Sequence, residues 1–147
     1  MTGSDRLASL ADVIPVPRID PEQRAYWQGT TREQLLLTSC NSCGEVIWHP
    51  RPFCPSCSSA DVSWMPASGS GVIYSYTIVR VGAEAEYARQ MPYVLAYVEL
   101  DEGPRVLTNV VGVTEEDLSI GLPVRAVFHH GRGFALTRFS AAPDRTS

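Results

Sequence analysis

Four cysteines in two close pairs offer the most specific chemistry in this sequence. Cys40 and Cys43 form the first pair, Cys54 and Cys57 form the second, and ten residues separate the pairs. Two residues between cysteines let a tight turn aim both sulfurs at one point, and two such turns complete a tetrahedral thiolate site. Gly44 suits the positive φ that follows the first turn. Because four thiolates leave no open coordination position, the pattern predicts a structural zinc ion.

Two other uses of the same cysteines stay open at this stage. A CxxC pair is also found in redox dithiols, and a cage of four thiolates also accepts iron. The sequence has no basic start followed by a long apolar run, and no stretch approaches the roughly 20 apolar residues that cross a bilayer. We therefore expect a cytoplasmic protein that does not enter a membrane. In a reducing compartment, paired cysteines are more typical of metal ligands than of disulfides.

The sequence shows no recognisable combination of catalytic residues. All twelve basic residues are arginine, which excludes Schiff-base and lysine general-base chemistry within this chain. His49, His129 and His130 lack a neighbouring nucleophile motif, so packing, surface or turn-flanking roles are expected. No two carboxylates are identifiable as acid and base, and residues 68–71 lack the lysine and helix of a phosphate-binding loop. The chain by itself is predicted not to be an enzyme.

Composition limits both the architecture and the partners. With 147 residues and 44% hydrophobic residues, the chain has material for one good core with a small added module. The formal net charge of −4 and the pI near 5.3 argue against nucleic acid, whose binding normally needs a basic face. A local basic patch would still be compatible with these totals.

The cysteine pairs must be positioned by short strands. A short apolar strand is predicted at residues 35–38, with a hairpin mate at 46–48, and together they make a ribbon. Ahead of it, Asp20-Pro21-Glu22 predicts a helix that runs to Gln28 and stops at Gly29, with Tyr26 and Trp27 packed on the neighbouring domain. Ser4 can cap an earlier amphipathic turn that carries Leu7, Leu10, Ala11 and Ile14. This first segment could be disordered.

A β-rich domain follows a flexible break at residues 68–71. Five strands are predicted, at 72–81, 93–100, 105–111, 124–129 and 134–139, with a tight turn at 101–104 and a helical turn at 114–118. Five antiparallel strands with one helical interruption predict a mainly β protein ending in a closed OB-fold barrel. The expected divisions are an N-terminal helical segment 1–34, a zinc ribbon 35–66, an OB-fold domain 67–141 and a flexible tail 142–147.

Two features of this domain could meet a ligand or partner. Tyr74, Tyr76, Tyr93 and Tyr97 have even spacings, so each pair is expected on one face of its strand. Such tyrosines could stack nucleobases, but a barrel core or a partner interface explains them equally well. The connection between residues 82 and 91 is longer than a tight hairpin needs, and loops of that length at a barrel mouth often contact a ligand.

The order of several motifs resembles one known family. CNSCGEVIWHPRPFCPSC, SGSGVIYSYTIV, PYVLAYVELDEGPRVLTNVVGV and IGLPVRAVF occur in series, as in the zinc-ribbon/OB-fold acyl-CoA-associated family, the domain of unknown function thirty-five. The likeness covers roughly residues 20–140. It implies a rubredoxin-like zinc ribbon with Cys40, Cys43, Cys54 and Cys57 as ligands, followed by an OB barrel.

The resemblance also implies a function. Members of this family are similar in lacking catalytic residues and in binding thiolase-superfamily enzymes or hydratases, where they stabilise the partner or complete an acyl-CoA channel. It implies a heteromer with a lipid-transfer-protein-type thiolase or aldolase in lipid or steroid side-chain degradation, and an acyl-CoA contact at Arg51, Pro52 and Phe53. Arg51 could pair with a coenzyme A phosphate or could only brace the ribbon. A nucleic-acid-binding OB module and a free-standing acyl-CoA binding protein remain the alternatives.

Overall fold

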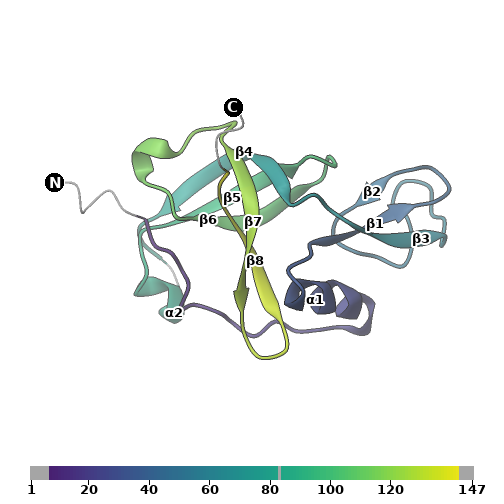
Figure 1. The fold of residues 1–147 in the computed structure, drawn as a ribbon, viewed down its shortest axis with the longest axis horizontal. Coiled ribbons are helices and arrows are strands. Elements are labelled where there is room, and N and C mark those ends of the chain that lie inside the picture. Colours follow the sequence, from purple (N-terminus) through teal and green to yellow (C-terminus); the bar gives the residue numbers. More distant parts are fainter. Residues whose placement is uncertain (1–6, 83, 143–147) are drawn as a thin grey trace.

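Strands dominate the part of the chain that the structure describes. The computed structural model covers residues 7–82 and 84–142, in which a helical segment, a ribbon and a barrel follow one another (Figure 1). The elements are η2 Pro21–Gln23, α1 Arg24–Thr31, β1 Leu36–Cys40, β2 Val46–Ile47, β3 Val62–Pro66, β4 Ser70–Val79, α2 Ala85–Ala88, β5 Tyr93–Leu100, β6 Arg105–Val111, η3 Glu115–Asp117, β7 Pro123–His130 and β8 Ala135–Ala141. In these residues we find no helix with the length and apolar character needed to cross a membrane.

The ribbon is a three-stranded antiparallel sheet in the order β2-β1-β3. Its central strand pairs Thr38 with Ile47 on one side and with Trp64 on the other. The strand β1 continues to Cys40 and so delivers the first cysteine directly from the sheet. The predicted zinc-ribbon scaffold is confirmed.

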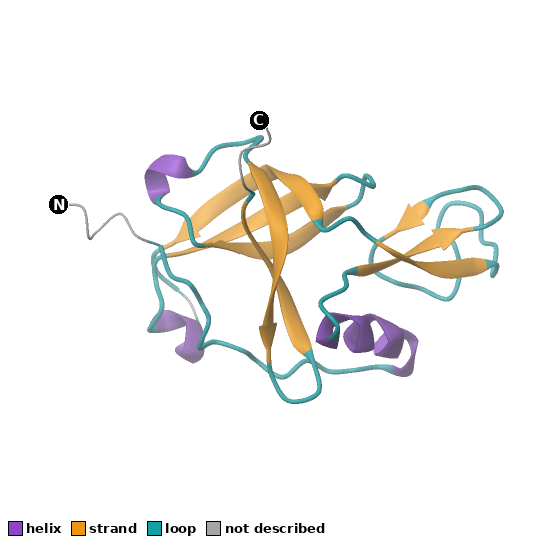
Figure 2. Cartoon of the chain, in the orientation of Figure 1, coloured by secondary structure: helices purple, strands orange, loops and turns teal. Residues whose placement is uncertain are grey.

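The barrel closes in the order β4-β5-β6-β8-β7, and β7 returns to pair with β4 (Figure 2). Every pairing is antiparallel except that of β6 with β8, so the predicted five-stranded OB-type barrel is confirmed. The break predicted at residues 68–71 is wrong in its second half, because β4 begins at Ser70. Gly71 belongs to that strand, and a glycine is required there because a Cβ would lie 2.5 Å from the carbonyl oxygen of Glu99.

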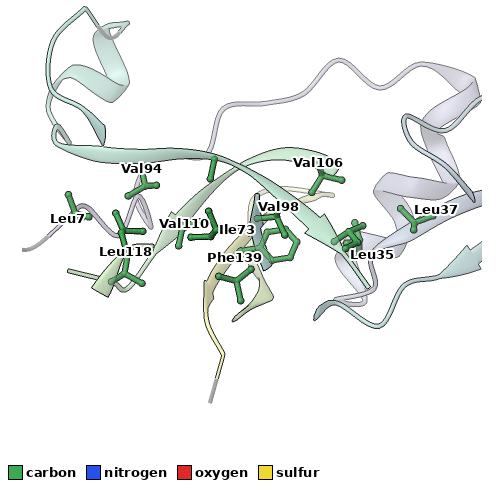
Figure 3. Packing of buried hydrophobic residues seen from close by; sticks show 14 residues of the cluster. Leu7, Leu35, Leu37, Ile73, Val94, Val98, Val106, Val110, Leu118 and Phe139 are labelled. Carbon is green, nitrogen blue, oxygen red and sulfur yellow. The ribbon is translucent and has the colours of Figure 1, made fainter. Parts of the chain in front are cut away.

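Apolar side chains fill the barrel interior from end to end. Ile73, Val98 and Phe139 occupy its middle, and each is at most 1% exposed. Figure 3 shows Leu7 beside Val94 and Leu118 at one end of this row and Leu35 at the other. Segments from outside the barrel therefore cover both of its ends, and the interior is packed core.

The N-terminal segment differs from the prediction. Ser4 lies outside the described residues, whereas Leu7, Leu10 and Val13 are buried against the barrel. Residues 7–14, which we call the N-terminal strap, form no helix, and their buried face does not include the exposed Ala11. The strap also donates a backbone hydrogen bond from Ala8 to the Pro92 carbonyl oxygen.

The helix also ends later than predicted. It continues to Thr31, and Gly29 lies inside it rather than ending it. A Cβ on Gly29 would lie 2.8 Å from the side chain of Leu36, so this glycine permits close packing of α1 on β1. The packing predicted for the helix aromatics is confirmed, because Tyr26 meets Trp48 edge to face and Trp27 meets Phe134.

Candidate functional site

The four cysteine sulfurs converge at the tip of the ribbon. All four lie within 4.8 Å of one another, and the Cys40–Cys57 and Cys43–Cys54 sulfur pairs are both 3.6 Å apart. Sulfurs placed 2.3 Å from a tetrahedral zinc ion would be separated by about 3.8 Å. The donor set and its spacing therefore fit one zinc ion, with no position left for water or substrate.

Backbone geometry is the same in both cysteine turns. The N–H of Gly44 donates to the Cys40 carbonyl, the N–H of Ser58 donates to the Cys54 carbonyl, and both residues have positive φ, +81° and +66°. The positive φ predicted for Gly44 is confirmed. The N–H of Cys43 also donates to the sulfur of Cys40, which lowers the pKa of that thiol to about 6. The pKa values of Cys43 and Cys57 are raised instead, so the lowered pKa favours the metal-binding thiolate at Cys40 alone of these three.

Arg51, Pro52 and Phe53 lie just before the second cysteine turn, and all three are exposed. Arg51 and Pro52 line a groove of about 170 Å³ that continues along the ribbon to Trp64 and across to Glu22 of η2. Phe53 is 48% exposed and does not line this groove. An arginine, a part-exposed indole and a shallow groove together could receive a phosphate and an adjoining flat ring.

A second polar feature lies inside the molecule and was not predicted. Arg138 of β8 is only 2% exposed, and its guanidinium donates to the carbonyl oxygens of Leu10 (2.9 Å) and Val13 (2.8 Å) in the N-terminal strap. Its other partners are the ring of His129, the hydroxyl of Tyr87 and the side-chain oxygen of Asn109. Among the described residues it pairs with no carboxylate. Its partners are mostly backbone carbonyl oxygens and neutral side chains, so no pattern of opposite charges in the sequence could identify Arg138 as a buried residue.

The histidines resolve into different roles. His129 was expected only to flank a turn, but its Nδ1 lies 2.7 Å from Nη1 of Arg138. An arginine can only donate, so this Nδ1 must accept and the ring must be neutral. His130 is exposed beside Glu33, and His49 is exposed and stacked on the ring of Trp48. Neither is positioned next to a nucleophile in the described residues.

Loss of stability in mild acid is expected at His129. Burial, followed by the neighbouring Arg138 charge, lowers the pKa of His129 below its ordinary value near 6.5. The unfolded chain therefore takes up a proton at a pH where the folded chain does not, so stability is lost as pH falls from about 6.5 towards the folded pKa. Thermal unfolding of His129→Gln, which keeps an acceptor for Arg138, should depend less on pH between 7.5 and 5.5 than unfolding of the natural chain.

The exposed neighbour provides the control for this experiment. His130→Gln should keep the natural pH dependence. Equal slopes for His129→Gln and the natural chain would contradict the assignment.

The long connection between β4 and β5 contains the helix α2. Tyr87 of this helix packs on Tyr93, and its hydroxyl oxygen accepts a hydrogen bond from Arg138. Between α2 and the N-terminal strap lies a cavity of about 420 Å³, lined by Val13 and Arg89 among others. The prediction that this connection meets a ligand stays a prediction.

Two family models match the chain in series. A rubredoxin-like zinc ribbon domain of ChsH2 matches residues 27–63, and the C-terminal OB-fold domain of ChsH2 matches residues 64–129. With the four sulfurs so close together, the first match identifies structural zinc as the cofactor. A DUF35 domain-containing scaffold protein of Methanocaldococcus jannaschii is 38% identical over 95 residues, which are 64% of this chain and 67% of that protein.

Other similar proteins are parts of coenzyme A enzymes. A probable enoyl-CoA hydratase alpha subunit of Thermomonospora curvata is 34% identical over 75% of this chain, but the chain spans only 34% of that subunit's length. A benzoylsuccinyl-CoA thiolase subunit, BbsA of Geobacter metallireducens, is 29% identical over 58% of this chain and 60% of that subunit. Among solved structures, a chain of an Ltp2-ChsH2(DUF35) aldolase superposes with a TM-score of 0.77 at 32% identity, covering 87% of this chain and all of that one.

Proposed function

Because the chain belongs to the DUF35 family of zinc-ribbon and OB-fold proteins, we propose that it is a non-catalytic accessory subunit of a thiolase-superfamily enzyme acting on acyl-CoA. The partner, a lipid-transfer-protein-type thiolase or aldolase, performs the chemistry, and this chain binds and stabilises it. The main support is the likeness to an aldolase complex and to a thiolase subunit. A scaffold role also agrees with the absence of a nucleophile–base pair among the described residues.

Cys40, Cys43, Cys54 and Cys57 are the proposed zinc ligands. Their sulfur spacing supports a closed structural site, in which the metal holds two turns of the ribbon together. Metal of this kind contributes folding free energy and leaves catalysis to other groups. The proposed role of zinc is thus to fix the shape of the ribbon.

The acyl-CoA contact is proposed at the groove beside the second cysteine turn. Arg51 would pair with a phosphate of coenzyme A, and Pro52 would line the path of the ligand. Phe53 lies at the margin of this region and is exposed, as a contact shared with a partner would be. In this arrangement the ribbon contributes one wall of the acyl-CoA channel and the partner contributes the rest.

The packed barrel argues against one rival, a free-standing acyl-CoA binding protein. A carrier needs an apolar cavity for the acyl chain, but the middle of the barrel is filled by Ile73, Val98 and Phe139. The hollow that reaches Phe139 of this row holds only about 30 Å³. The acyl chain is therefore assigned to the partner.

The decisive experiment is affinity capture of the tagged chain from its native extract, with identification and intact mass of the complex. We expect a thiolase-superfamily subunit in stoichiometric amount, because an accessory subunit forms a stable complex with its enzyme. Extract passed over the tag alone is the control. The captured complex, and not the isolated chain, should turn over acyl-CoA; assays with fatty and steroid side-chain thioesters then test the proposed pathway.

Capture of the chain alone would contradict the proposal. Acyl-CoA turnover at enzymatic rates by the isolated chain would contradict it equally. Recovery with single-stranded nucleic acid, weakened by added salt, would instead favour the rival OB-fold module.

A further inference from the structure

Exposed apolar side chains gather on one wall of the barrel. Tyr74, Tyr97 and Leu107 are 46%, 46% and 55% exposed and come from the three adjacent strands β4, β5 and β6. We call these three residues the tyrosine face. Monomeric proteins usually expose large apolar residues singly, so three on neighbouring strands require an explanation.

Strand register brings the members of this face together, because a bulge between Ile73 and Ser75 places Tyr74 beside the pair formed by Ser75 and Tyr97. Tyr97 lies opposite Leu107 on one side and opposite Ser75 on the other. Directly opposed residues on paired strands have Cβ atoms about 5 Å apart, so the Tyr97 and Leu107 side chains are neighbours. A shallow hollow of about 220 Å³ runs beside them and is lined also by Tyr76 and Leu95. The face thus offers a depression that an apolar side chain can enter.

The charges at the border of the face neutralise each other. Arg105 pairs with Glu99 at 3.1 Å, and its guanidinium carbon lies 3.7 Å from the centroid of the Tyr74 ring. The arginine nearest to the tyrosines is thus already engaged by a carboxylate and an aromatic ring. A phosphate backbone needs free cations next to the aromatic platforms, so this face is unsuited to nucleic acid.

Its character matches the centre of a protein interface. Such centres are depleted in charge and enriched in tyrosine, and their border is polar. The three side chains expose on the order of 300 Å², taking roughly 200 Å² for a whole aromatic side chain. A standard interface takes about 800 Å² from each partner, so the face would form the central part of a larger contact. A neutral face is complementary to a neutral, apolar patch.

We propose that the tyrosine face docks the thiolase-superfamily subunit of the proposed function, against a neutral, apolar patch of that subunit. This inference rests on the proposed function and adds to it the surface that makes the contact. Tyr97 and Leu107 form its centre, because they oppose each other directly and lie beside the hollow. Arg105 and Glu99 form part of its border, where an ion pair already satisfied within this chain adds little to affinity.

The test measures the affinity of purified chain variants for the thiolase-superfamily subunit captured with the natural chain. The double variant Tyr97→Thr/Leu107→Thr keeps residues that favour strands and removes the apolar centre. We expect its dissociation constant to rise at least tenfold. The matched control is Val81→Thr/Ile120→Thr, which changes two side chains that are 82% and 71% exposed and lie outside these three strands. It should bind like the natural chain.

A second measurement is independent of substitution. In hydroxyl-radical footprinting, Tyr97 and Leu107 should lose reactivity in the complex, whereas Val81 should not. Equal affinity of the double variant with unchanged footprints would overturn this inference and leave the proposed function standing. Capture of no thiolase-superfamily enzyme by the natural chain would overturn both. A homodimer of the chain that dissociates in the double variant would show that the face serves self-association instead.

Discussion

Cys54→Ser is expected to abolish zinc binding and to unfold the ribbon. The measured zinc content should fall from one ion per chain to none. Structural zinc contributes about 10–16 kcal/mol of apparent binding free energy in small modules of this kind, so a ribbon without it should not hold together. Cys54 is fully buried, and its sulfur lies 3.6 Å from that of Cys43. Serine offers a poor ligand for zinc in its place, and the two cysteine turns lose their common anchor.

Tryptophan fluorescence can measure this loss selectively. The three tryptophans are Trp27, Trp48 and Trp64, all in α1 or the ribbon and none in the barrel. Emission should therefore shift to longer wavelength in Cys54→Ser and in the natural chain after strong chelation. Ser56→Ala, inside the same turn, should keep both zinc and emission. Full zinc content in Cys54→Ser would exclude the proposed set of four ligands, and visible colour in the natural chain would identify iron.

Arg138→Met is expected to destabilise the barrel and to release the N-terminal strap. The substitution leaves the carbonyl oxygens of Leu10 and Val13 without donors in a buried site, at a cost of about 1–3 kcal/mol for each unpaired group. Relief of the desolvation that lowers the pKa of Arg138 offsets part of this cost. We expect a net loss of about 3 kcal/mol and a melting temperature lower by roughly 10 °C.

The N-terminal strap should respond more strongly than the rest of the molecule. Limited proteolysis should cut within residues 7–14 in Arg138→Met under conditions where the natural chain is intact. Arg125→Met is the matched control, because Arg125 lies on the neighbouring strand β7 and is exposed. Its melting temperature should change by no more than about 2 °C. Equal melting temperatures for the two variants would mean that Arg138 does not hold the strap.

Local spacing explains which parts of this molecule could be predicted. The cysteine turns depend on residues three or four positions apart, and the hairpin of β5 and β6 depends on the turn at 101–104, so both can be recognised in the sequence. The 3₁₀ turn at η3 was likewise predicted, and Thr114 caps it as its side chain accepts from the N–H of Asp117. In each case the residues that determine the conformation are neighbours in the chain.

The features that were missed depend on distant residues. Gly71 resembled a linker residue, but its strand role follows from the approach of Glu99, which only the barrel creates. Gly29 resembled a helix stop in the sequence. Its actual role is to let Leu36 pack closely on the helix, and that contact exists only after the ribbon has packed. The order of the strap could not be predicted, because nothing near it in the sequence identifies Arg138 as its partner. The zinc ligands were predictable; the contacts that hold the N-terminal strap were not.

The distance along the chain between Leu10 and Arg138 has a consequence for the order of assembly. These residues are 128 positions apart, whereas Cys40 and Cys57 are separated by 17. During synthesis, the ribbon can bind its metal soon after Cys57 leaves the ribosome. The apolar side chains of the strap, in contrast, stay uncovered until nearly the whole barrel has been made. In a nascent chain the strap therefore emerges well before its partner Arg138 and is covered only after β8 has been made.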